Sequence, residues 1–312
     1  MEQKRPKILT IGSANMDMTL RLTRVPSPGE TLIDNGSVSY SPGGKTANAA
    51  AAFAKLGADC VFCTRLGADT HGQRLYNTYR SLGINTQFIT VDKTVPTGFA
   101  AVLVEADGQN RIIVYPGANA GFTREDVDAA LTCAPDAIFL QFEIPFEIVE
   151  YILHQAYLMR IPVFIDGGPA SADYRLEALP SIELFSPNEE ETFVYTGIRP
   201  TGADSCLRAA IELQRRVRAR YYVLKLGDRG AYIYDGRLCH MIASYTVAAV
   251  DTTAAGDAFT AALTLEYLRN GGNMPDACRF ANAVGALTVM REGSTTAIPT
   301  AAEVADFMRR HA

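Results

Sequence analysis

Taken by itself, the sequence predicts an α/β fold in which a mostly parallel β-sheet is covered by helices on both faces. After about residue 126, apolar runs of strand length alternate with helical segments of about 10 to 15 residues, which is typical of parallel sheets. Polar or glycine-rich clusters follow these runs, and the carboxyl ends of parallel strands are where such sheets bind ligands. The length of 312 residues allows one large domain or two modest ones, and we expect a single domain over residues 1–312.

The first predicted strand covers residues 7–12, and Asn15 and Asp17 follow it. In extended chain these two side chains face the same way, because they are two residues apart. The pair either binds a ligand at the carboxyl end of the strand or forms an ordinary Asx turn. No GxGxxG motif follows the strand, which argues against a dinucleotide-binding domain.

Two β-rich segments, about residues 14–42 and 95–118, interrupt the α/β alternation. Pro26, Pro28 and Gly29 break the first segment into short pieces, while the second carries Asp107-Gly108 between two apolar runs, a strong hairpin signal. Two β-rich excursions from one core can pair with each other. We therefore predict a small, discontinuous β lid built from these segments.

A glycine pair, Gly43 and Gly44, precedes Lys45 and an alanine-rich helix expected at residues 47–56. The run Gly44-Lys45-Thr46 imitates the end of a Walker A loop, but that loop needs a glycine at position 39, where this chain has Ser. We therefore reject a P-loop. Lys45 and Asn48 are three residues apart and share one helix face.

The remaining elements are predicted from apolar periodicity and from the glycines and prolines between them. Further strands are expected at residues 60–65, near 88–91, and at 137–141, 161–166, 182–186 and 221–226, with a hairpin at 231–240. Further helices are expected at residues 72–82, 146–159, 204–218 and 274–290, with a last helix from residue 300. Glu143 and Asn188 lie just beyond two of the strands, where ligands are expected.

Residues 251–259 are the most informative segment of the chain for function. Small residues there lead directly into an apolar helix pattern. A helix is expected to begin near residues 255–257 and to end at residues 270–272. Its first N–H groups have no intrahelical partner, and Ala254, Ala255 and Gly256 leave room for an anion to approach them. Asp257 would then lie beside the anion, where a carboxylate can take a proton from an attacking hydroxyl. The alternative is that Asp257 only caps the helix.

Charge and composition argue against several classes of protein. The net charge of −5 and the isoelectric point near 5.5 are unlike those of a nucleic-acid-binding protein, which is usually basic. No apolar run reaches the ~18 residues that a membrane-spanning helix needs. The polar start of the chain does not resemble a signal peptide. We expect a protein of the cytoplasm with neither nucleic-acid nor membrane partners.

The cysteines and histidines do not indicate a zinc site. Cys60 and Cys63 have CxxC spacing, but they lie in an apolar strand and no second CxxC pair exists. The four histidines form neither an HxH nor an HxxxH pair. We interpret the cysteines as structural and reduced.

Four motifs in order along the chain give it a resemblance to the ribokinase-like (PfkB-type) carbohydrate kinases, over essentially its whole length. The amino-terminal motif is Gly43-Gly44-Lys45-x-x-Asn48, with Asn15-x-Asp17 before it. The others are Asn188-x-x-Glu191, Leu226-Gly227-x-x-Gly230 and Asp251-Thr252-x-Ala254-x-Gly256-Asp257-x-Phe259. This family implies a three-layer α/β sandwich with a central, mostly parallel sheet and a small β lid.

The resemblance implies a role for each residue of the sugar side. Asp257 would be the base that takes the proton from a primary hydroxyl of the sugar. The backbone N–H groups of Ala254, Ala255, Gly256 and Asp257 would form an anion hole for the γ-phosphate. The sugar hydroxyls would be held by the other residues of these motifs and by one strand-end carboxylate: Asn15, Asp17, Gly43, Gly44, Lys45, Asn48 and Glu143.

The resemblance also implies sites for ATP, Mg²⁺ and K⁺. Asn188 would contact phosphate, and Glu191 would orient Mg²⁺ through water. The nucleotide pocket would be lined by Lys225, Gly227, Asp228 and Asn282. An activating K⁺ beside the anion hole would be bound, mostly through carbonyl groups, by Asp251, Thr253, Thr288, Arg291 and Gly293.

Several positions depart from the family's usual pattern. Lys225 stands where ribokinases often carry Thr, so contacts on the adenine side are expected to differ. Asp166-Gly167-Gly168-Pro169 replaces a more usual Asn-Pro segment. Ala297 stands where a Ser hydroxyl is usual, which puts K⁺ activation in question. Phe99 is expected where the lid meets the sugar, and its ring would alter which sugar fits.

These features lead to one main hypothesis and two alternatives. The main hypothesis is an ATP-dependent sugar kinase that converts D-ribose to D-ribose 5-phosphate and pairs through its lid as a homodimer. One alternative is a PfkB-type kinase for a ketose, a 2-keto-3-deoxy sugar acid or a nucleoside. The other is a non-catalytic sugar-binding relative, which the loss of Gly256 or Asp257 would have favoured; both residues are present.

Overall fold

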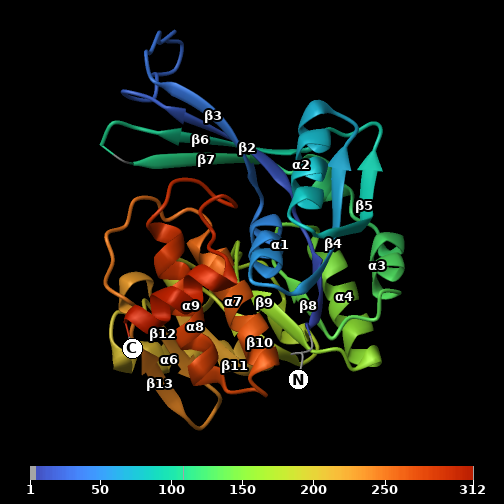
Figure 1. Cartoon of the computed structure of the whole chain (residues 1–312), viewed down its shortest axis with the longest axis vertical. Coiled ribbons are helices and arrows are strands. Elements are labelled where there is room, and N and C mark those ends of the chain that lie inside the picture. The colour runs from blue at the N-terminus through green and yellow to red at the C-terminus, as the bar shows by residue number, and fades with distance from the viewer. Residues whose placement is uncertain (1–4, 108, 312) are drawn as a thin grey trace.

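A nine-stranded β-sheet lies between two layers of helices in the computed structural model, which describes residues 5–107 and 109–311 (Figure 1). The strand order is β13-β12-β11-β10-β9-β8-β1-β4-β5. The strands are β1 (Lys7–Ile11), β4 (Asp59–Gly67), β5 (Asn85–Asp92), β8 (Ala137–Leu140), β9 (Val163–Asp166), β10 (Ile182–Ser186), β11 (Ala219–Lys225), β12 (Ala231–Tyr234) and β13 (Cys239–Ile242). The β11–β12 and β12–β13 pairs are antiparallel and the other pairs are parallel, so the predicted fold class is confirmed.

The helices bury one apolar core on each face of this sheet. The first layer packs on the core that contains Ile8 and Phe53 and consists of α1 (Lys45–Lys55), α2 (Thr70–Ser81), α7 (Ala255–Arg269), α8 (Met274–Val289) and α9 (Ala301–Arg310). The second layer packs on the core that contains Leu9 and Ile11 and consists of α3 (Arg124–Leu131), α4 (Phe146–Met159), α5 (Glu189–Thr196) and α6 (Ala203–Arg216). Successive residues of β1 thus enter opposite cores, because side chains alternate along a strand and both faces are covered.

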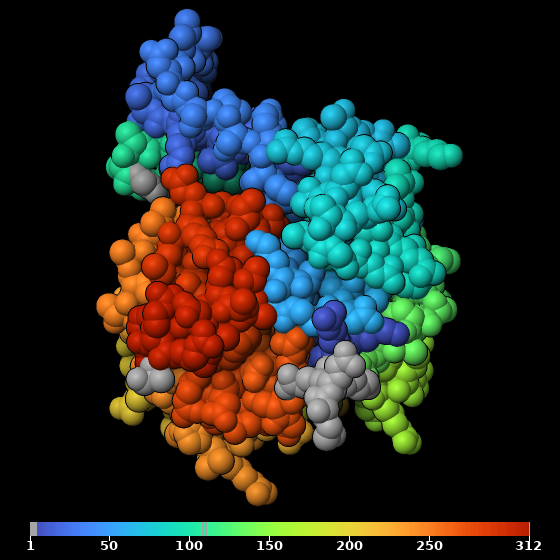
Figure 2. Space-filling model, in the orientation of Figure 1, coloured from blue at the N-terminus to red at the C-terminus, as the bar shows by residue number. Residues whose placement is uncertain are grey.

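A second, four-stranded sheet projects from the body as a lid (Figures 1 and 2). Its order is β3-β2-β6-β7, with β2 (Asn15–Arg21), β3 (Ser37–Gly43), β6 (Gly98–Val104) and β7 (Asn110–Tyr115). The strand β2 pairs parallel with β6, and the other pairs are antiparallel. Gly108, in the predicted hairpin turn, lies outside the described residues. The two β-rich segments therefore pair with each other, and β2 and β3 lead directly into the body.

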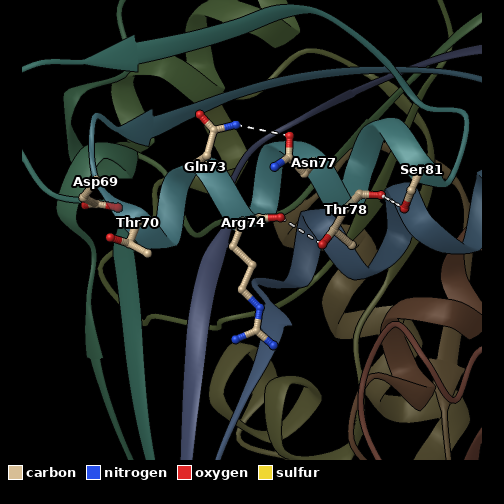
Figure 3. Close-up of a pocket in the computed structure, with 7 residues that line it drawn as sticks. All are labelled: Asp69, Thr70, Gln73, Arg74, Asn77, Thr78 and Ser81. Carbon is tan, nitrogen blue, oxygen red and sulfur yellow. Dashed lines mark hydrogen bonds between the residues drawn. The ribbon is translucent and has the colours of Figure 1, made fainter.

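Helix α2 attaches the lid to the body (Figure 3). On its outer side Gln73 donates to Asn77 at 3.1 Å, while Thr78 donates to the backbone of the same helix. Arg74 points away from these side chains and donates from Nη2 to the carbonyl oxygen of Tyr40, on β3, at 3.2 Å. These side chains line a surface pocket together with Asp69, Thr70 and Ser81, and their hydrogen bonds run within α2 or to the lid. None of the motif residues lines this pocket, so we do not regard it as the ligand site.

Two helices were not expected from periodicity. Helices α3 and α5 have only eight residues each, and both begin with a capping box, centred on Thr123 and Asn188. Such short helices hold too few apolar repeats for a periodicity argument. Helix α7, which was expected to begin near residues 255–257, begins at Ala255. Among the described residues, no helix is both long enough and apolar enough to span a membrane.

Candidate active site

The residues of the four motifs gather where the strands of the large sheet end and the lid begins. Asn15 follows β1, Glu143 follows β8, and Asn188 follows β10, so these residues lie at one edge of the parallel sheet. Helices α1 and α7 begin at the same place and contact each other through their small residues. Residues that are far apart in sequence thus form one site at the carboxyl edge, as expected for such sheets.

Asp257 lies in the first turn of α7 and is held by three side chains. Its side chain is buried, with 6% of the residue exposed. Oδ2 accepts a hydrogen bond from Asn48 Nδ2 at 2.9 Å, and Oδ1 accepts one from Gln141 Nε2 at 3.2 Å. Lys45 Nζ lies 3.9 Å from Oδ1, and the Asp257 carboxylate raises the pKa of Lys45 above its usual value. The carboxylate is therefore fixed in place by donors and can still accept a proton.

Among the described residues, no side chain caps the amino terminus of α7, although the first N–H groups of a helix need partners from outside it. Ala254 precedes the helix in the left-handed conformation, with φ of 60° and ψ of 0°. Gly256 is exposed, and Ala255 is half-buried. Because the first N–H groups of a helix carry partial positive charge, this end can bind an anion beside Asp257. Asp257 is not the cap of α7, so the capping alternative is wrong.

Two buried oxygen atoms of the site lack a hydrogen-bond partner among the described residues: Asp17 Oδ1 and Asn48 Oδ1. Buried polar atoms are rarely left without a partner, and each one costs about 1–3 kcal/mol. Gly43 lies against Asp17, since a Cβ atom at this position would come within 2.0 Å of Asp17 Oδ2. The pocket therefore offers acceptors to a ligand that brings its own hydroxyl or amine donors.

The neighbouring residues hold the walls of this pocket. Asn15 Oδ1 accepts a hydrogen bond from Asn119 Nδ2 at 2.7 Å, and the backbone N–H of Ala14 donates to Asn119 Oδ1 at 3.0 Å. Glu143 Oε2 accepts from the backbone N–H of Lys45 at 2.9 Å and from the Ser13 hydroxyl. Glu143 thus joins β8 to the start of α1.

Sequence analysis missed Gln141 and Asn119 as site residues. Both belong to segments that follow the family's pattern, so a signal was present. However, each acts on a partner more than 100 positions away, at separations of 116 residues for Gln141–Asp257 and 104 for Asn119–Asn15. Only the tertiary structure shows which groups they orient.

Asp17 is electrostatically unlike an ordinary surface carboxylate. Burial, together with the nearby carboxylates of Glu143 and Asp257, raises the pKa of Asp17 to about 7. Desolvation and like charge both disfavour its ionised form. A strongly perturbed carboxylate in a polar pocket is typical of a functional site.

Phe99 does not reach this pocket, which corrects the sequence-based expectation. In the lid, Asp17 pairs with Ala100, whereas Met16 pairs with Phe99. Because side chains alternate along strands, Phe99 faces away from Asp17. Its ring lies 6.0 Å from that of His71 on α2, which in turn stacks on Tyr40 at 5.9 Å. Phe99 therefore helps to attach the lid, and Ala100 occupies the ligand-facing side.

Asn188 and Glu191 form a reciprocal capping box at the start of α5. Asn188 Oδ1 accepts from the backbone N–H of Glu191 at 2.8 Å, and Glu191 Oε2 accepts from that of Asn188 at 2.7 Å. The other carboxylate oxygen, Oε1, faces Gly168, because a Cβ atom at that position would come within 2.2 Å of it. Burial raises the pKa of Glu191, and Lys225 opposes that shift. Each residue thus has a structural role, and Glu191 keeps one oxygen free of the cap.

Lys225, predicted to line the nucleotide pocket, lies close to the start of α7. Its Nζ donates to Asp166 Oδ2 at 2.5 Å, and a Cβ atom at Gly256 would lie 3.7 Å from this Nζ. Lys225 is the last residue of β11, where its side chain reaches across the sheet edge to the end of β9.

The other predicted nucleotide residues lie beside this edge. Gly227 and Asp228 form an exposed turn directly after β11, and Gly227 has a φ of 58°. Asn282, on α8, is buried and donates from Nδ2 to the carbonyl oxygens of Ile242 and Ala243 at 3.2 and 3.0 Å. Its amide nitrogen is therefore used to hold the chain that follows β13.

The residues predicted to bind K⁺ connect two loops beside α7. Asp251 accepts from the backbone N–H of Thr253 at 2.9 Å and from that of Gly293 at 3.0 Å. The backbone N–H of Arg291 donates to the carbonyl oxygen of Thr288 at 3.2 Å. The loop before α7 and the loop after α8 are thus held together. Among the described residues, no group of three His, Cys, Asp or Glu side chains is arranged to hold a metal ion.

The family model described as "pfkB family carbohydrate kinase" matches residues 5–301. Among curated proteins, the ribokinase of Staphylococcus aureus is 33% identical over 300 residues, which cover 96% of this chain and 98% of that protein. The ribokinase of Haemophilus influenzae is 30% identical over 307 residues, covering 97% and 99% of the two chains.

Solved structures give the same result. The structure of Arabidopsis thaliana ribokinase in complex with ribose and ATP matches with a TM-score of 0.87 at 28% identity, covering 98% of this chain and 99% of that one. Thermotoga maritima ribokinase matches with a TM-score of 0.84 at 33% identity, with coverage of 97% and 99%.

Proposed function

Because the chain belongs to the pfkB family of carbohydrate kinases, which are phosphotransferases with an alcohol group as acceptor, we propose that it phosphorylates D-ribose with ATP to give D-ribose 5-phosphate. The observation that carries the proposal is the pair of buried acceptors beside Asp257 that find no partner among the residues that the structure describes, Asp17 Oδ1 and Asn48 Oδ1. Sugar hydroxyls are donors of the kind that this pocket lacks. Asn15, Gly43, Gly44, Lys45 and Glu143 complete its walls.

In the proposed reaction, Asp257 takes the proton of the primary hydroxyl as the sugar oxygen attacks the γ-phosphorus. The new P–O bond forms while the bond between that phosphorus and the bridging oxygen breaks, and ADP leaves. At the start of α7 the backbone N–H groups of Gly256 and Asp257 would face the charge that spreads over the transferred phosphoryl oxygens, while that of Ala255 also donates to the carbonyl oxygen of Thr252 at 3.3 Å. Lys45 stabilises the negative charge near Asp257 until proton transfer.

ATP requires a divalent cation, and we propose that Glu191 orients Mg²⁺. Its Oε1 is free of the capping box, and Mg²⁺ usually binds one or two carboxylates together with waters and substrate phosphates. Bound Mg²⁺ would neutralise phosphate charge during transfer. Asn188 and the turn at Gly227 and Asp228 would then border the phosphates and the nucleotide.

A K⁺ site beside α7 is also proposed, with carbonyl groups as the main ligands. Each carboxylate oxygen of Asp251 accepts one backbone N–H group and keeps a lone pair for an ion, so Asp251 can both shape the loop and contribute a ligand. The carbonyls of Thr253, Thr288, Arg291 and Gly293 are the other candidates. Ala297 is buried and has no hydroxyl to offer. Comparing rates in K⁺ and in N-methylglucamine buffers would test this site, and equal rates would contradict it.

We further propose that two copies of the chain pair through their lids. The lid carries apolar side chains that are at least half exposed: Val38, Ile112, Ile113, Val114 and Tyr115. Ile112 and Ile113 lie on opposite faces, so Ile112→Asp and Ile113→Asp, compared by light scattering, would show which face pairs. A wild-type monomer would contradict the proposal. A cytoplasmic location agrees with the six free cysteines.

The substrate is tested by ADP release with MgATP and K⁺ on a panel: ribose, deoxyribose, fructose, a 2-keto-3-deoxy sugar acid and adenosine. Deoxyribose is included because the deoxyribokinase of Salmonella typhimurium is 28% identical over 304 residues. We expect the highest kcat/KM with ribose. Turnover of another compound with ribose inactive would disprove the ribose assignment while keeping the kinase, and no turnover at all would favour a sugar-binding relative.

A further inference from the structure

Two departures from the family pattern, Asp166 and Lys225, are in direct contact. Lys225 Nζ donates to Asp166 Oδ2 at 2.5 Å, across 59 positions of sequence. Both residues are buried, with 1% of Asp166 and 8% of Lys225 exposed. A charged group at such depth needs an opposite partner, because isolated buried charges are very costly. The two residues therefore act as a unit.

Thr260 fixes this pair to the helix of the anion hole. Its hydroxyl donates to Asp166 Oδ2 at 2.5 Å, and Lys225 Nζ lies 3.3 Å from the same hydroxyl. Gly256 lies one turn earlier on that face of α7, and a Cβ atom there would be 3.7 Å from Lys225 Nζ. The ammonium group thus lies within one helical turn of the anion site.

The ammonium group has a donor to spare. It carries three N–H donors, and its hydrogen bonds to described residues use two of them, to Asp166 and Thr260. Only Gly256, which has no side chain, separates it from the helix end. Any larger residue at position 256 would have its Cβ in contact with Lys225 Nζ.

We propose that Lys225, held by Asp166 and Thr260, is a charged member of the anion hole that donates a hydrogen bond to the phosphoryl group in transfer. The inference rests on the proposed reaction and adds to it a residue with a named role. Lys225 would only donate a hydrogen bond, while Asp257 accepts the proton of the sugar hydroxyl. A charged donor fixed in a site with little water stabilises developing negative charge without reorganisation.

The alternative is a buried ion pair that only stabilises the fold. The two explanations predict different nucleotide affinities for variants of Lys225. If Lys225 binds the γ-phosphate, its loss should weaken the binding of AMP-PNP more than that of ADP; if the pair only stabilises the fold, both affinities should change equally. The variants are Lys225→Met and the double variant Lys225→Met/Asp166→Asn, which leaves no unpaired charge. Lys7→Met is the control, since Lys7 Nζ donates to the Cys133 carbonyl at the opposite edge of the sheet.

For each variant we would measure kcat, thermal unfolding, and the affinities for ADP and the nonhydrolysable analogue AMP-PNP by calorimetry. Losing one donor to a developing oxyanion typically lowers kcat by roughly 10²- to 10³-fold, and we expect a similar loss in both Lys225 variants. AMP-PNP should lose about tenfold or more in affinity, ADP much less, and Lys7→Met should behave as wild type.

Equal losses of ADP and AMP-PNP affinity, or a double variant with wild-type kcat, would overturn the proposal and leave a structural pair. The nucleotide comparison does not depend on the sugar. If the wild type phosphorylated no sugar of the panel, the proposed function would fail, while the AMP-PNP to ADP ratio would still decide the role of Lys225.

Discussion

The proposed sugar side and the proposed phosphate side of the site are built in different ways. On the sugar side, Asn15, Asn48 and Asp257 are buried side chains with 3–6% exposure. On the phosphate side, Gly227 and Gly256 are exposed, and the proposed anion site combines backbone N–H groups at the start of α7 with the Lys225 ammonium group. In the proposed reaction, one side would recognise hydroxyls through buried side chains, and the other would bind phosphate mainly through main-chain N–H groups, with Lys225 as an added donor.

This difference predicts how each side tolerates substitution. Buried polar side chains are fixed by mutual hydrogen bonds, so one change disturbs several partners. Backbone donors depend on conformation rather than on residue identity, so conservative changes there should have small effects. Asp257 lies where the two sides meet and should be the most sensitive position of all.

The largest effect is expected for Asp257→Asn. The amide keeps the shape of the carboxylate and cannot accept the hydroxyl proton, so kcat should fall by at least ~10²-fold. Sugar affinity, measured by calorimetry without nucleotide, should change far less. Asp173→Asn, at an exposed position outside the site, is the matched control. Activity of Asp257→Asn within tenfold of wild type would remove Asp257 as the base.

A smaller effect is expected for Gly43→Ala, which should weaken sugar binding and leave ATP binding nearly unchanged. The new methyl group would meet the Asp17 carboxylate at 2.0–2.2 Å and must displace it. Losing hydrogen bonds to a charged acceptor costs about 1.5–3 kcal/mol, so sugar KM should rise roughly 10- to 100-fold while ATP KM stays within a few-fold. Gly285→Ala, on α8 with open space around it, should leave both KM values unchanged. Equal effects on both KM values would contradict a division between the two sides.

The next effect is a pH dependence of sugar binding that comes from Asp17. Its carboxyl faces the carboxylates of Glu143 and Asp257, and its pKa is about 7. If the ionised form accepts the sugar hydroxyls, wild-type affinity should rise by about tenfold between pH 6 and 8. In Asp17→Asn this rise should disappear. An identical pH profile in the variant would show that Asp17 does not bind the sugar.

The same shift predicts an opposite change in stability. The folded pKa of Asp17 lies above the value of 3.8 expected in the unfolded chain. Its stabilising contribution is therefore complete below about pH 3.8 and is lost as the pH rises through about 7. Without sugar, Asp17→Asn should gain in melting temperature over wild type as the pH rises from 5 to 8. A constant difference across that range would contradict the raised pKa.

Sequence reasoning was strongest where a local pattern determines the structure. Residues 251–257 combine small residues with a helix start, and α7 begins at Ala255 as predicted. The capping box of Asn188 and Glu191 was also readable, because N-x-x-E before a helix is its signature, although it was interpreted only as a ligand motif. Such features depend on neighbours within one turn.

Features that depend on register or on distant partners were not predictable. The side of the lid that Phe99 faces follows from the pairing of β2 with β6, which no local pattern specifies. Likewise, Asp166 and Lys225 looked like two unrelated departures until the parallel strands brought their ends together. Their contact needs the order of β9, β10 and β11, which is a property of the whole sheet.

The smallest effect is expected for Ala254→Gly, and it examines the phosphate side directly. Ala254 has a φ of 60°, a conformation that costs an alanine about 1–2 kcal/mol and a glycine very little. The greater freedom of glycine in the unfolded chain cancels about 0.5–1 kcal/mol of this, so a net stabilisation of about 1 kcal/mol or less should appear in urea unfolding. Ala255→Gly, inside the first turn of α7, should instead destabilise by about 1 kcal/mol. If the backbone N–H groups of the anion site depend on conformation and not on the side chain at position 254, kcat of Ala254→Gly should stay close to wild type, whereas a large loss would show that the methyl group of Ala254 shapes the site.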